Sequence, residues 1–555
     1  MFRYIKLLFF FFLQIDVFGQ VISRGPYLQI GTSSGITLVW NTNIDADTKV
    51  WLGENYKDQK VVFESVEKTI DHIVVLKDLK PKTKYYYSIG SSDSKPIIDS
   101  TFYFLTSPPE GSKNKFRFIA FGDCGTGTSN QKIVLDRVQK YFNNEPINGW
   151  LLLGDNAYNY GFLDEYQKYF FDVYSNNILK NTVLWPAPGN HDYGGRPVWP
   201  NDWGKEPKYF DFFVLPTKGE AGGVSSGSEA YYSYNYANVH FVSLDSYGAE
   251  EGLLMADSLS KQVNWLKKDL SSNKLPWTVV YFHHPPFSKG SHDSDKELDL
   301  VAIRENLVKV LEKYKVDLVL SGHSHNYERS YFMKDHFGSE ESFDLKKHAI
   351  SSSNGKYDGT ENSCPYVKSD SGTVYIVAGT AGWVGGTSVG YPHNAMVYSN
   401  SDKTGALILE VEDNRFDVKY LSEDGEIVDK FTMFKDVNKK NKSEIACGDL
   451  LNLGASWNDD FVWNVAKASS KNLVIDSLNR NAVFVVSDSK KCLKDEFQVF
   501  VKPYPSIKVE SNSPVLYGST IAFSTNFSTK GELNWEGPNG FMSNDLLPKI
   551  NPAYP

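Results

Sequence analysis

The chain has few cysteines, few methionines and no excess of basic residues. Four cysteines in 555 residues allow at most two disulfides, which excludes a small scaffold held together mainly by disulfide bonds. Aspartate and glutamate (67) outnumber lysine and arginine (58), so no basic field exists to displace counterions and a nucleic-acid partner is not expected. No segment reaches the roughly 20 apolar residues that a membrane span needs.

The N-terminus has the layout of a secretory signal peptide. Arg3 and Lys6 precede the apolar run 7–13, and small and polar residues follow by Gly19-Gln20. A buried N-terminal strand is the alternative interpretation. We therefore expect residues 1–20 to be a signal peptide, and the mature protein to be exported, extracellular or at the cell surface, without a membrane span. There is no cysteine near the expected cleavage site, so a lipid anchor is not expected there.

The four cysteines allow one disulfide to be predicted. Cys447 and Cys492 bracket a single β-like module, so we expect them to pair. Cys124 lies inside one of the motifs described below and is expected to be free and buried. Cys364 lies in a polar loop, and the sequence leaves open whether it meets Cys124.

The length requires several domains, and the first is β-rich. Residues 22–107 contain alternating apolar and polar runs, such as 36–40 and 48–52, which predict strands. The segment from Leu79 to Tyr85 resembles the tyrosine corner of fibronectin type III and related sandwiches. We therefore expect an N-terminal β-sandwich of that kind. Residues 107–111 then form a linker.

Strands and helices alternate in the central region, residues 114–434. Strands are expected at 116–121, 150–153, 277–282, 316–321 and 373–378, with helices around 133–141, 259–270 and 301–314, and with hairpins over 406–434. This order indicates an α/β domain, in which ligands collect where strands end.

The C-terminal region is expected to contain immunoglobulin-like β modules. Residues 435–442 are rich in lysine and are expected to form a solvated linker. Residues 445–503 resemble an immunoglobulin- or PKD-like module and are expected to form one. Residues 505–555 begin a second that stops before it has enough strands to close a sandwich. We expect a chain that continues beyond residue 555 or a poorly ordered end.

Five short motifs follow one another along the central region, each after a short apolar run. They are Gly122-Asp123-Cys124-Gly125, Gly154-Asp155-Asn156-Ala157-Tyr158, Gly189-Asn190-His191-Asp192, His283-His284-Pro285-Pro286 and Gly322-His323-Ser324-His325. Carboxylate, phenolate, amide oxygen and imidazole together suit two adjacent metal ions better than one. Because all five motifs follow strands, we expect them to share one site.

Each motif alone has a plainer interpretation: a turn at Asp123, a packed core tyrosine at Tyr158, a surface loop around His323 and His325. Two histidines separated by one residue lie on the same side of an extended segment, so both can face a metal pair. The ordered combination favours a two-metal hydrolase of phosphoesters over these separate interpretations.

The ordered set resembles the purple acid phosphatases, within the calcineurin-like metallophosphoesterases, over residues 114–434. Larger members of that family carry a fibronectin-like domain in front, as residues 22–107 would be here. The resemblance implies an α/β/β/α sandwich with two metal ions. It assigns Asp123, Asp155, Tyr158 and His325 to the first metal and Asn190, His283 and His323 to the second, with Asp155 bridging.

The adjacent His283 and His284 should point to opposite sides, so only one is expected to bind metal. His283 is preferred because Val280 precedes it by three residues and Pro285 follows by two, as in the family. The resemblance also implies that His191 contacts the substrate phosphate. By the same resemblance, His292, nine residues beyond His283, is the acid that protonates the leaving group.

The expected function is that of a secreted acid phosphatase. It would hydrolyse phosphomonoesters of small molecules or proteins by attack of a hydroxide bound at a dinuclear centre, Fe(III) with Fe(II), Zn(II) or Mn(II). One alternative is a phosphodiesterase or nucleotide pyrophosphatase on the same fold, which the Tyr158-type ligand disfavours. The other is a non-catalytic cell-surface protein whose β modules contact glycans or partners.

Overall fold

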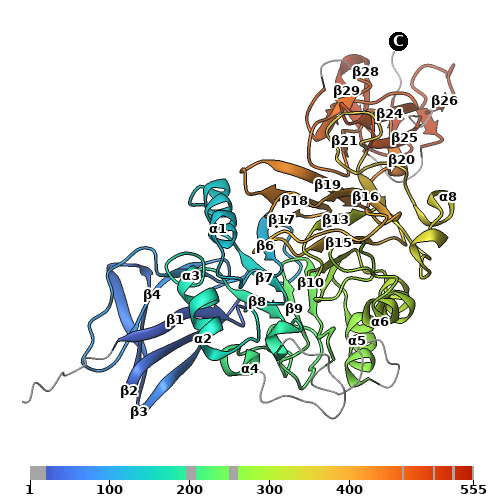
Figure 1. Cartoon of the computed structure of the whole chain (residues 1–555). Helices are drawn as coiled ribbons and strands as arrows, with labels where there is room; N and C mark the ends of the chain where they lie inside the picture. Colours follow the sequence, from blue (N-terminus) through green and yellow to red (C-terminus); the bar gives the residue numbers. More distant parts are fainter. Residues whose placement is uncertain are drawn as a thin grey trace, which may run out of the picture. The chain divides into compact units, whose positions relative to one another are not determined.

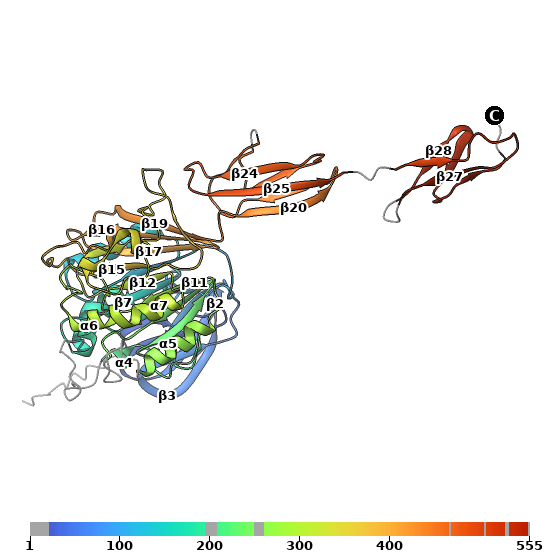
Figure 2. The same ribbon diagram turned by 90° about the vertical axis from the view of Figure 1, so that its right-hand side faces the viewer.

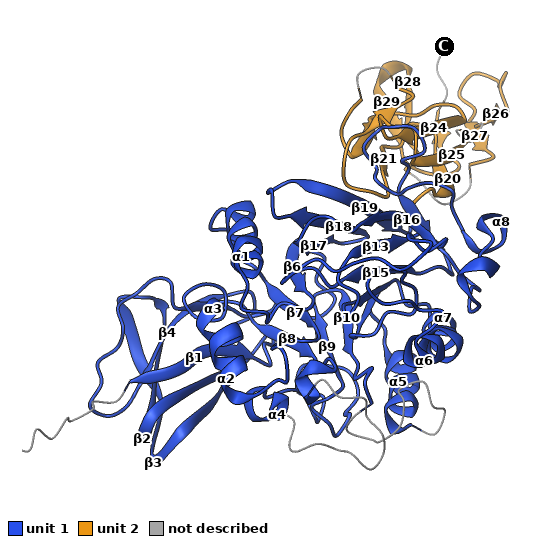
Figure 3. Cartoon of the chain, viewed as in Figure 1, with its two compact units in different colours: residues 1–436 blue, residues 437–555 orange. Residues whose placement is uncertain are grey.

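A computed structural model describes residues 21–194, 208–248, 260–465, 468–503, 507–527 and 532–552. The expected signal peptide and Leu259 lie outside these residues. The chain divides into two compact units, residues 1–436 and 437–555 (Figure 3). Among the described residues, no helix is both long enough and apolar enough to cross a membrane.

Two seven-stranded sheets form the centre of the first unit (Figure 1). The first sheet has the order β16 (Met396–Asn400), β13 (Tyr327–Ser330), β15 (Val374–Ala378), β12 (Leu318–Ser321), β11 (Trp277–Tyr281), β10 (Val239–Ser243) and β9 (Tyr232–Tyr236). The second has the order β14 (Tyr366–Lys368), β19 (Ile427–Lys435), β18 (Arg415–Ser422), β17 (Gly405–Glu412), β6 (Phe116–Phe121), β7 (Gly149–Leu153) and β8 (Leu184–Ala187). The hairpins expected over 406–434 are present as β17–β18 and β18–β19.

Alternation along the strands builds a layered core. Val279 and Tyr281 of β11 join the large cluster that also contains Phe118 and Leu409 of the other sheet, whereas Val280 and Phe282 join a second cluster with helical side chains. That outer face is covered by α5 (Lys261–Ser272) and by the helical run of α6 (Leu298–Ala302), η3 (Ile303–Leu307) and α7 (Val308–Lys313) (Figure 2).

The other sheet is covered by α1 (Ser129–Phe142), which packs on β17 and β18. The Thr128 hydroxyl caps its N-terminus by accepting from the Gln131 amide. The short helical segments α2 (Leu163–Glu165), η1 (Tyr166–Phe171), α3 (Asp172–Tyr174) and α4 (Tyr209–Phe212) lie in the connections around β7, β8 and β9. Two more, η4 (Glu340–Ser342) and α8 (Leu345–His348), lie between β13 and β14.

The N-terminal domain contains β1 (Ile22–Gln29), β2 (Ile36–Asn55), β3 (Asp58–Leu76), β4 (Lys84–Gly90) and β5 (Tyr103–Leu105). Hydrogen bonds join all five strands into one sheet rather than two separate ones, because the long β2 pairs with β1 in its first half and with β4 in its second. Register shifts after Asn41 accommodate this.

The tyrosine corner is confirmed, since the Lys80 amide donates to the Tyr85 hydroxyl over 3.0 Å. The N-terminal domain is also tied to the central one. The Tyr27 hydroxyl donates to the Phe212 carbonyl over 2.5 Å, and the Tyr87 hydroxyl donates to the Lys180 carbonyl over 2.7 Å.

The second unit is entirely β among its described residues, apart from the turn η5 (Pro538–Gly540). Its strands are β20 (Lys440–Ala446), β21 (Leu451–Gly454), β22 (Val462–Trp463), β23 (Asn472–Ile475), β24 (Ala482–Ser487), β25 (Lys494–Lys502), β26 (Val509–Ser511), β27 (Ile521–Thr525), β28 (Trp535–Gly537), β29 (Phe541–Ser543) and β30 (Lys549–Ile550). The prediction of a lysine-rich linker over 435–442 is partly wrong, because residues 440–442 belong to β20. That strand lies at a sheet edge and is almost wholly exposed, so it lacks the apolar alternation that predicts a strand.

The predicted Cys447–Cys492 disulfide is wrong, because Cys447 is a free thiol. β20 runs parallel to β25, so the Cys447 amide donates to Lys502 at the far end of β25, while Cys492 precedes its first residue. At about 3.3 Å per residue, the length of β25 from Lys494 to Lys502 alone is roughly 26 Å, so the two cysteines are well beyond the roughly 7 Å that a disulfide tolerates. Cys124 is free and buried, as expected.

Candidate metal centre

All five motifs follow strands whose carboxyl ends lie along one edge of each sheet. Strands β6, β7 and β8 are parallel, so Asp123, Asp155 and Asn190 emerge at the same edge of one sheet. Strands β11 and β12 are also parallel, so His283 and the His323 loop emerge at one edge of the other sheet. Contacts of His283 with Asn190 and of His325 with Asp123 show that these two edges meet.

The Tyr158 hydroxyl lies among side chains from three motifs. It donates to Asp123 Oδ1 at 2.8 Å and to Asp155 Oδ2 at 3.0 Å, and His325 Nε2 lies 3.3 Å away. His325 Nε2 is in turn 3.2 Å from Asp123 Oδ1. Asp123, Asp155, Tyr158 and His325, the set expected for a first metal, therefore converge on one point.

Asp155 also contacts the residues expected for a second metal. His283 Nε2 lies 3.2 Å from Asp155 Oδ2 and 3.1 Å from Asn190 Oδ1. His283 Nδ1 donates to the Leu153 carbonyl over 2.8 Å, which orients the ring with Nε2 toward Asp155. The neighbouring His284 instead has its Nδ1 2.8 Å from the Ser246 hydroxyl.

His323 reaches the cluster by a different route from the one expected. Its φ of +66° is left-handed, so the segment between His323 and His325 is not extended and the same-side argument does not apply. The His323 ring lies 5.0 Å from that of His283, while its Nε2 is 3.5 Å from Glu297 Oε2. The His323 ring therefore lies beside His283, one of the residues expected for the second metal, but its Nε2 faces Glu297.

Glycine at the start of three of the motifs is required by close packing against another motif. A Cβ on Gly154 would lie 2.5 Å from His283 Nδ1, and one on Gly322 would lie 2.4 Å from Asp123 Oδ2. A Cβ on Gly189 would meet Asp155 Oδ1 at 2.3 Å. Any larger residue there would push a neighbouring candidate ligand out of place.

Backbone strain is concentrated at the same residues. Asp123 and Asp155 have φ values of +57° and +52°, a region that non-glycine residues rarely occupy. Such strain persists when the surrounding structure imposes it, and it clusters at functional sites. Together with His323, three candidate ligands adopt this conformation.

The charges of the buried side chains in the cluster favour binding of a cation. Burial opposes ionisation of Asp155, but His283 and the His191 amide hold its pKa well below the usual range. Burial disfavours the His283 cation, yet Asp155 and Asp123 raise its pKa to about 9. Burial and the same two carboxylates raise the pKa of Tyr158 well above 10.

No lysine or arginine within the described ranges pairs with Asp123 or Asp155, which are 0% and 1% exposed. Two buried carboxylates next to a phenol and imidazoles are a donor set for hard and borderline metal ions. The residues therefore fit a metal centre, and the positive charge that they lack is what such ions would supply.

The two further histidines lie beside the cluster. His191 Nδ1 donates to the Asn159 carbonyl over 2.6 Å, and its Nε2 lies 3.8 Å from Asp155 Oδ2. His292 Nδ1 donates to the Glu297 carboxylate over 2.9 Å, and its ring lies 3.7 Å from that of His323. Both histidines therefore have one nitrogen held by the protein.

Sequence reasoning missed Glu297 and Trp383. Glu297 orients His292. The only feature of the sequence that could have indicated it is its position five residues beyond that histidine. The Trp383 indole lies against His325 and comes from a glycine-rich segment that carries no ligand. Asp192, in contrast, lies in a motif: its buried carboxylate accepts from Asn156, Gly189 and Tyr166, and so joins two motif loops.

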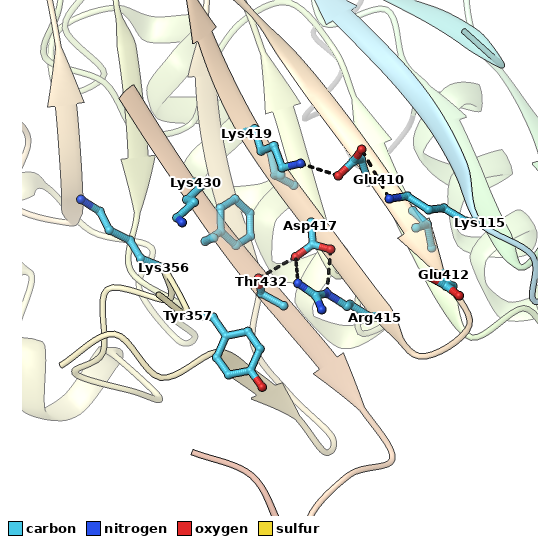
Figure 4. Close-up of a pocket in the computed structure, with 13 residues that line it drawn as sticks. Lys115, Lys356, Tyr357, Glu410, Glu412, Arg415, Asp417, Lys419, Lys430 and Thr432 are labelled. Atoms are coloured by element: carbon cyan, nitrogen blue, oxygen red, sulfur yellow. Dashed lines mark hydrogen bonds and ion pairs between the residues drawn. The ribbon is translucent and has the colours of Figure 1, made fainter. Parts of the chain in front are cut away.

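A separate hollow of about 260 Å³ lies on strands β17–β19 (Figure 4). It adjoins the start of β6, since Glu410 pairs in register with Arg117, whereas Asp123 follows the end of that strand. Its charges largely satisfy one another, with Lys419 beside Glu410 and Arg415 beside Asp417. This hollow is therefore distinct from the candidate metal centre.

The region that contains the five motifs is similar to known proteins. Residues 116–327 match the family model described as calcineurin-like phosphoesterase. Purple acid phosphatase 1 of Ipomoea batatas is 28% identical over 381 residues, which are 65% of this chain and 70% of that protein. Probable purple acid phosphatase 20 of Arabidopsis thaliana is 32% identical over 264 residues, 46% of this chain and 54% of that protein.

The chain thus spans from about half to 70% of the length of these relatives. Among solved structures, purple acid phosphatase PPD1 from yellow lupin (Lupinus luteus) seeds has a TM-score of 0.57 at 20% identity, and the match covers 74% of each chain. At that identity the likeness shows the fold.

Proposed function

We propose that this chain, which carries a calcineurin-like phosphoesterase domain and is related to purple acid phosphatases, hydrolyses phosphomonoesters at a dinuclear metal centre. One observation carries the proposal. The Tyr158 hydroxyl lies within 3.3 Å of Asp123, Asp155 and His325, so a phenol shares a buried point with ligands from three separate loops.

Seven side chains would hold the two metal ions, with Asp155 shared. They are Asp123, Tyr158 and His325 on one side and Asn190, His283 and His323 on the other. Bound metal ions would lower the pKa of water and neutralise charge on the phosphoryl group. A phenolate is a hard ligand that suits a strongly charged ion, so Fe(III) is assigned to the position beside Tyr158. Fe(II), Zn(II) or Mn(II) would occupy the other position.

The flanking histidines are suited to act on the substrate. Because His191 Nδ1 is engaged by Asn159, its Nε2 is the nitrogen available to donate to a phosphoryl oxygen near Asp155. Because His292 Nδ1 is engaged by Glu297, its other ring nitrogen is available to protonate the leaving alkoxide. The two histidines thus divide substrate binding and leaving-group protonation.

Export is the expected setting for this activity. Its support is the N-terminal order of basic residues, an apolar run and small residues. The substrate would be a phosphorylated small molecule or protein. All seven candidate ligands lie in the first unit, and the second unit is proposed to serve contacts with a surface or with glycans.

Hydrolysis of p-nitrophenyl phosphate and of bis(p-nitrophenyl) phosphate, measured with metal content on the same sample, tests the proposal. We expect about two metal ions per chain and a preference for the monoester. Asp155→Asn should lose metal and activity. The matched control is Asp136→Asn, at an exposed carboxylate paired with Lys140, and it should retain both. Active protein without metal, or a clear preference for the diester, would contradict the proposal.

A further inference from the structure

An exposed tryptophan stands beside the candidate metal centre. Trp383 lies between β15 and β16, and 43% of its surface is exposed. Its ring centroid is 5.0 Å from that of His325 and 6.0 Å from that of Tyr158, and its indole nitrogen donates to His325 Nε2 over 3.3 Å. One part of the indole thus contacts the candidate ligands while another part faces outward.

The segment around Trp383 is held in place by hydrogen bonds on both sides of it. The Ala381 amide donates to the Gly122 carbonyl over 3.1 Å, and the Thr128 hydroxyl donates to the Gly382 carbonyl over 2.7 Å. After the tryptophan, the Gly385 amide donates to the His325 carbonyl over 2.7 Å. These bonds hold the indole at the site rather than leaving it on a free loop.

The same segment is joined to the loop that carries His292. The Ser388 amide donates to the Gly290 carbonyl over 2.7 Å, and the His325 amide donates to the Ser291 hydroxyl over 2.8 Å. Trp383 and His292 therefore come from two neighbouring loops on either side of His325. In the proposed reaction, a leaving group protonated by His292 would lie near these loops.

Two more exposed aromatic side chains follow Tyr158. Tyr160 and Phe162 are 50% and 54% exposed, and their ring centroids are 5.4 Å apart. Glu165 holds this turn, because its carboxylate accepts from the amides of Asn159, Tyr160 and Phe162. Exposed aromatic groups beside a catalytic site are typical of a surface that binds an apolar part of a ligand.

We propose that Trp383 determines specificity for the leaving group, and that it selects phosphomonoesters whose alcohol carries a planar aromatic ring. This rests on the phosphatase function proposed above. A planar ring, either aryl or nucleobase, would stack on the exposed indole face, whereas a small alkyl alcohol has no flat surface to place there. Tyr160 and Phe162, two and four residues beyond Tyr158 in the sequence, would offer a further aromatic surface.

The test compares ligands with and without a ring on the full, metal-loaded chain. Calorimetric titration with phenylphosphonate and methylphosphonate, which are not hydrolysed, measures binding without turnover. Stacking of this kind corresponds to roughly 5- to 100-fold in affinity. We therefore expect Trp383→Ala to weaken phenylphosphonate by that factor relative to methylphosphonate. Trp383→Phe, which keeps a ring but loses the N–H, should retain most of the preference.

Kinetics supply a second readout with a matched control. The ratio of kcat/KM for phenyl phosphate, or for AMP, to kcat/KM for glycerol 3-phosphate should fall at least fivefold in Trp383→Ala. The ring-bearing substrate that loses more identifies the source as aryl or nucleobase. Val389→Ala removes an 89% exposed apolar side chain from the same segment and should leave the ratio unchanged.

Equal losses for all ligands in Trp383→Ala would overturn the proposal, because the tryptophan would then act only through His325. Unchanged ratios would overturn it as well. A wild-type protein that hydrolyses none of the three esters would instead contradict the phosphatase function. The phosphonate titrations would still report on Trp383 in that case.

Discussion

The buried ion pair between Arg329 and Asp429 is expected to be a major support of the site. Arg329 lies on β13, four residues beyond His325, and Asp429 lies on β19 of the other sheet. The pair is bidentate, with Arg329 Nε 2.6 Å from Asp429 Oδ2 and Nη2 2.9 Å from Oδ1, and both side chains are 0% exposed. It therefore links the two sheets at the strand that follows the His323–His325 loop.

Asp429→Ala should lower the free energy of unfolding by about 3–5 kcal/mol. Removing the carboxylate leaves a fully buried guanidinium without its counter-charge, which is the costly case for buried ion pairs. The Tyr327 hydroxyl, which donates to Asp429 Oδ2 over 2.9 Å, also loses its acceptor. Since whole domains are stable by only about 5–15 kcal/mol, the variant is expected to be marginal.

Replacing both partners separates the lost charge pairing from the lost packing. Arg329→Met combined with Asp429→Leu should be less destabilised than Asp429→Ala alone, because no unpaired charge remains. It should still fall below the wild type, because Tyr327 keeps no acceptor. Urea denaturation of the full chain, followed in the transition of the first unit, gives the free energies.

Asp424→Ala, in the exposed pair of Lys403 and Asp424, is the control and should unfold close to the wild type. An Asp429→Ala protein as stable as this control would refute the reasoning. So would a double variant that is less stable than the single one.

Four further outcomes are expected. Asp155→Ala should lose both metal ions in elemental analysis, because the Asp155 carboxylate contacts the candidate ligands of both metals. Full activity in that variant would rule out a two-metal centre. Tyr158→Phe should lose a visible phenolate-to-iron absorption band while retaining metal, and an unchanged spectrum would exclude the phenolate. His292→Ala should slow alkyl esters by about 10²–10⁴-fold, and aryl esters less, at constant metal content; equal losses would argue against an acid role. Burial lowers the pKa of His336 to about 4 and that of His393 to about 3, so the unfolded chain binds more protons below pH 6.5. The free energy of unfolding should therefore fall as the pH drops from about 6.5 toward 4. Urea denaturation from pH 7 to 4.5 measures this fall. If the double variant His336→Gln, His393→Gln loses stability with pH as steeply as the wild type, the explanation is wrong.

Much of the candidate centre could be predicted because its chemistry restricts residue types. Asp123, Asp155, Asn190 and His283 each follow a short apolar strand, and strand ends in α/β domains lie at a common edge. The glycines before three of these motifs belong to the same signal, because any side chain there would collide with a ligand of another loop. The tyrosine corner at Tyr85 was predictable for a similar reason, since its hydrogen bond is local in sequence.

Contacts between distant loops could not be predicted. The left-handed conformation of His323 arises from packing against Asp123, whose Oδ2 accepts from the His323 amide 200 residues away in sequence. The failure of the Cys447–Cys492 pair follows from the parallel pairing of β20 with β25, which an exposed edge strand does not signal.

The sequence by itself determined the ligand types, their order and the strands that present them, because metal chemistry and strand periodicity are written locally. Only the tertiary structure decided which carboxylate orients His292 and which aromatic ring stands over His325. Those choices belong to loops that meet only after both sheets have packed, so neither Glu297 nor Trp383 carries a local pattern that marks it.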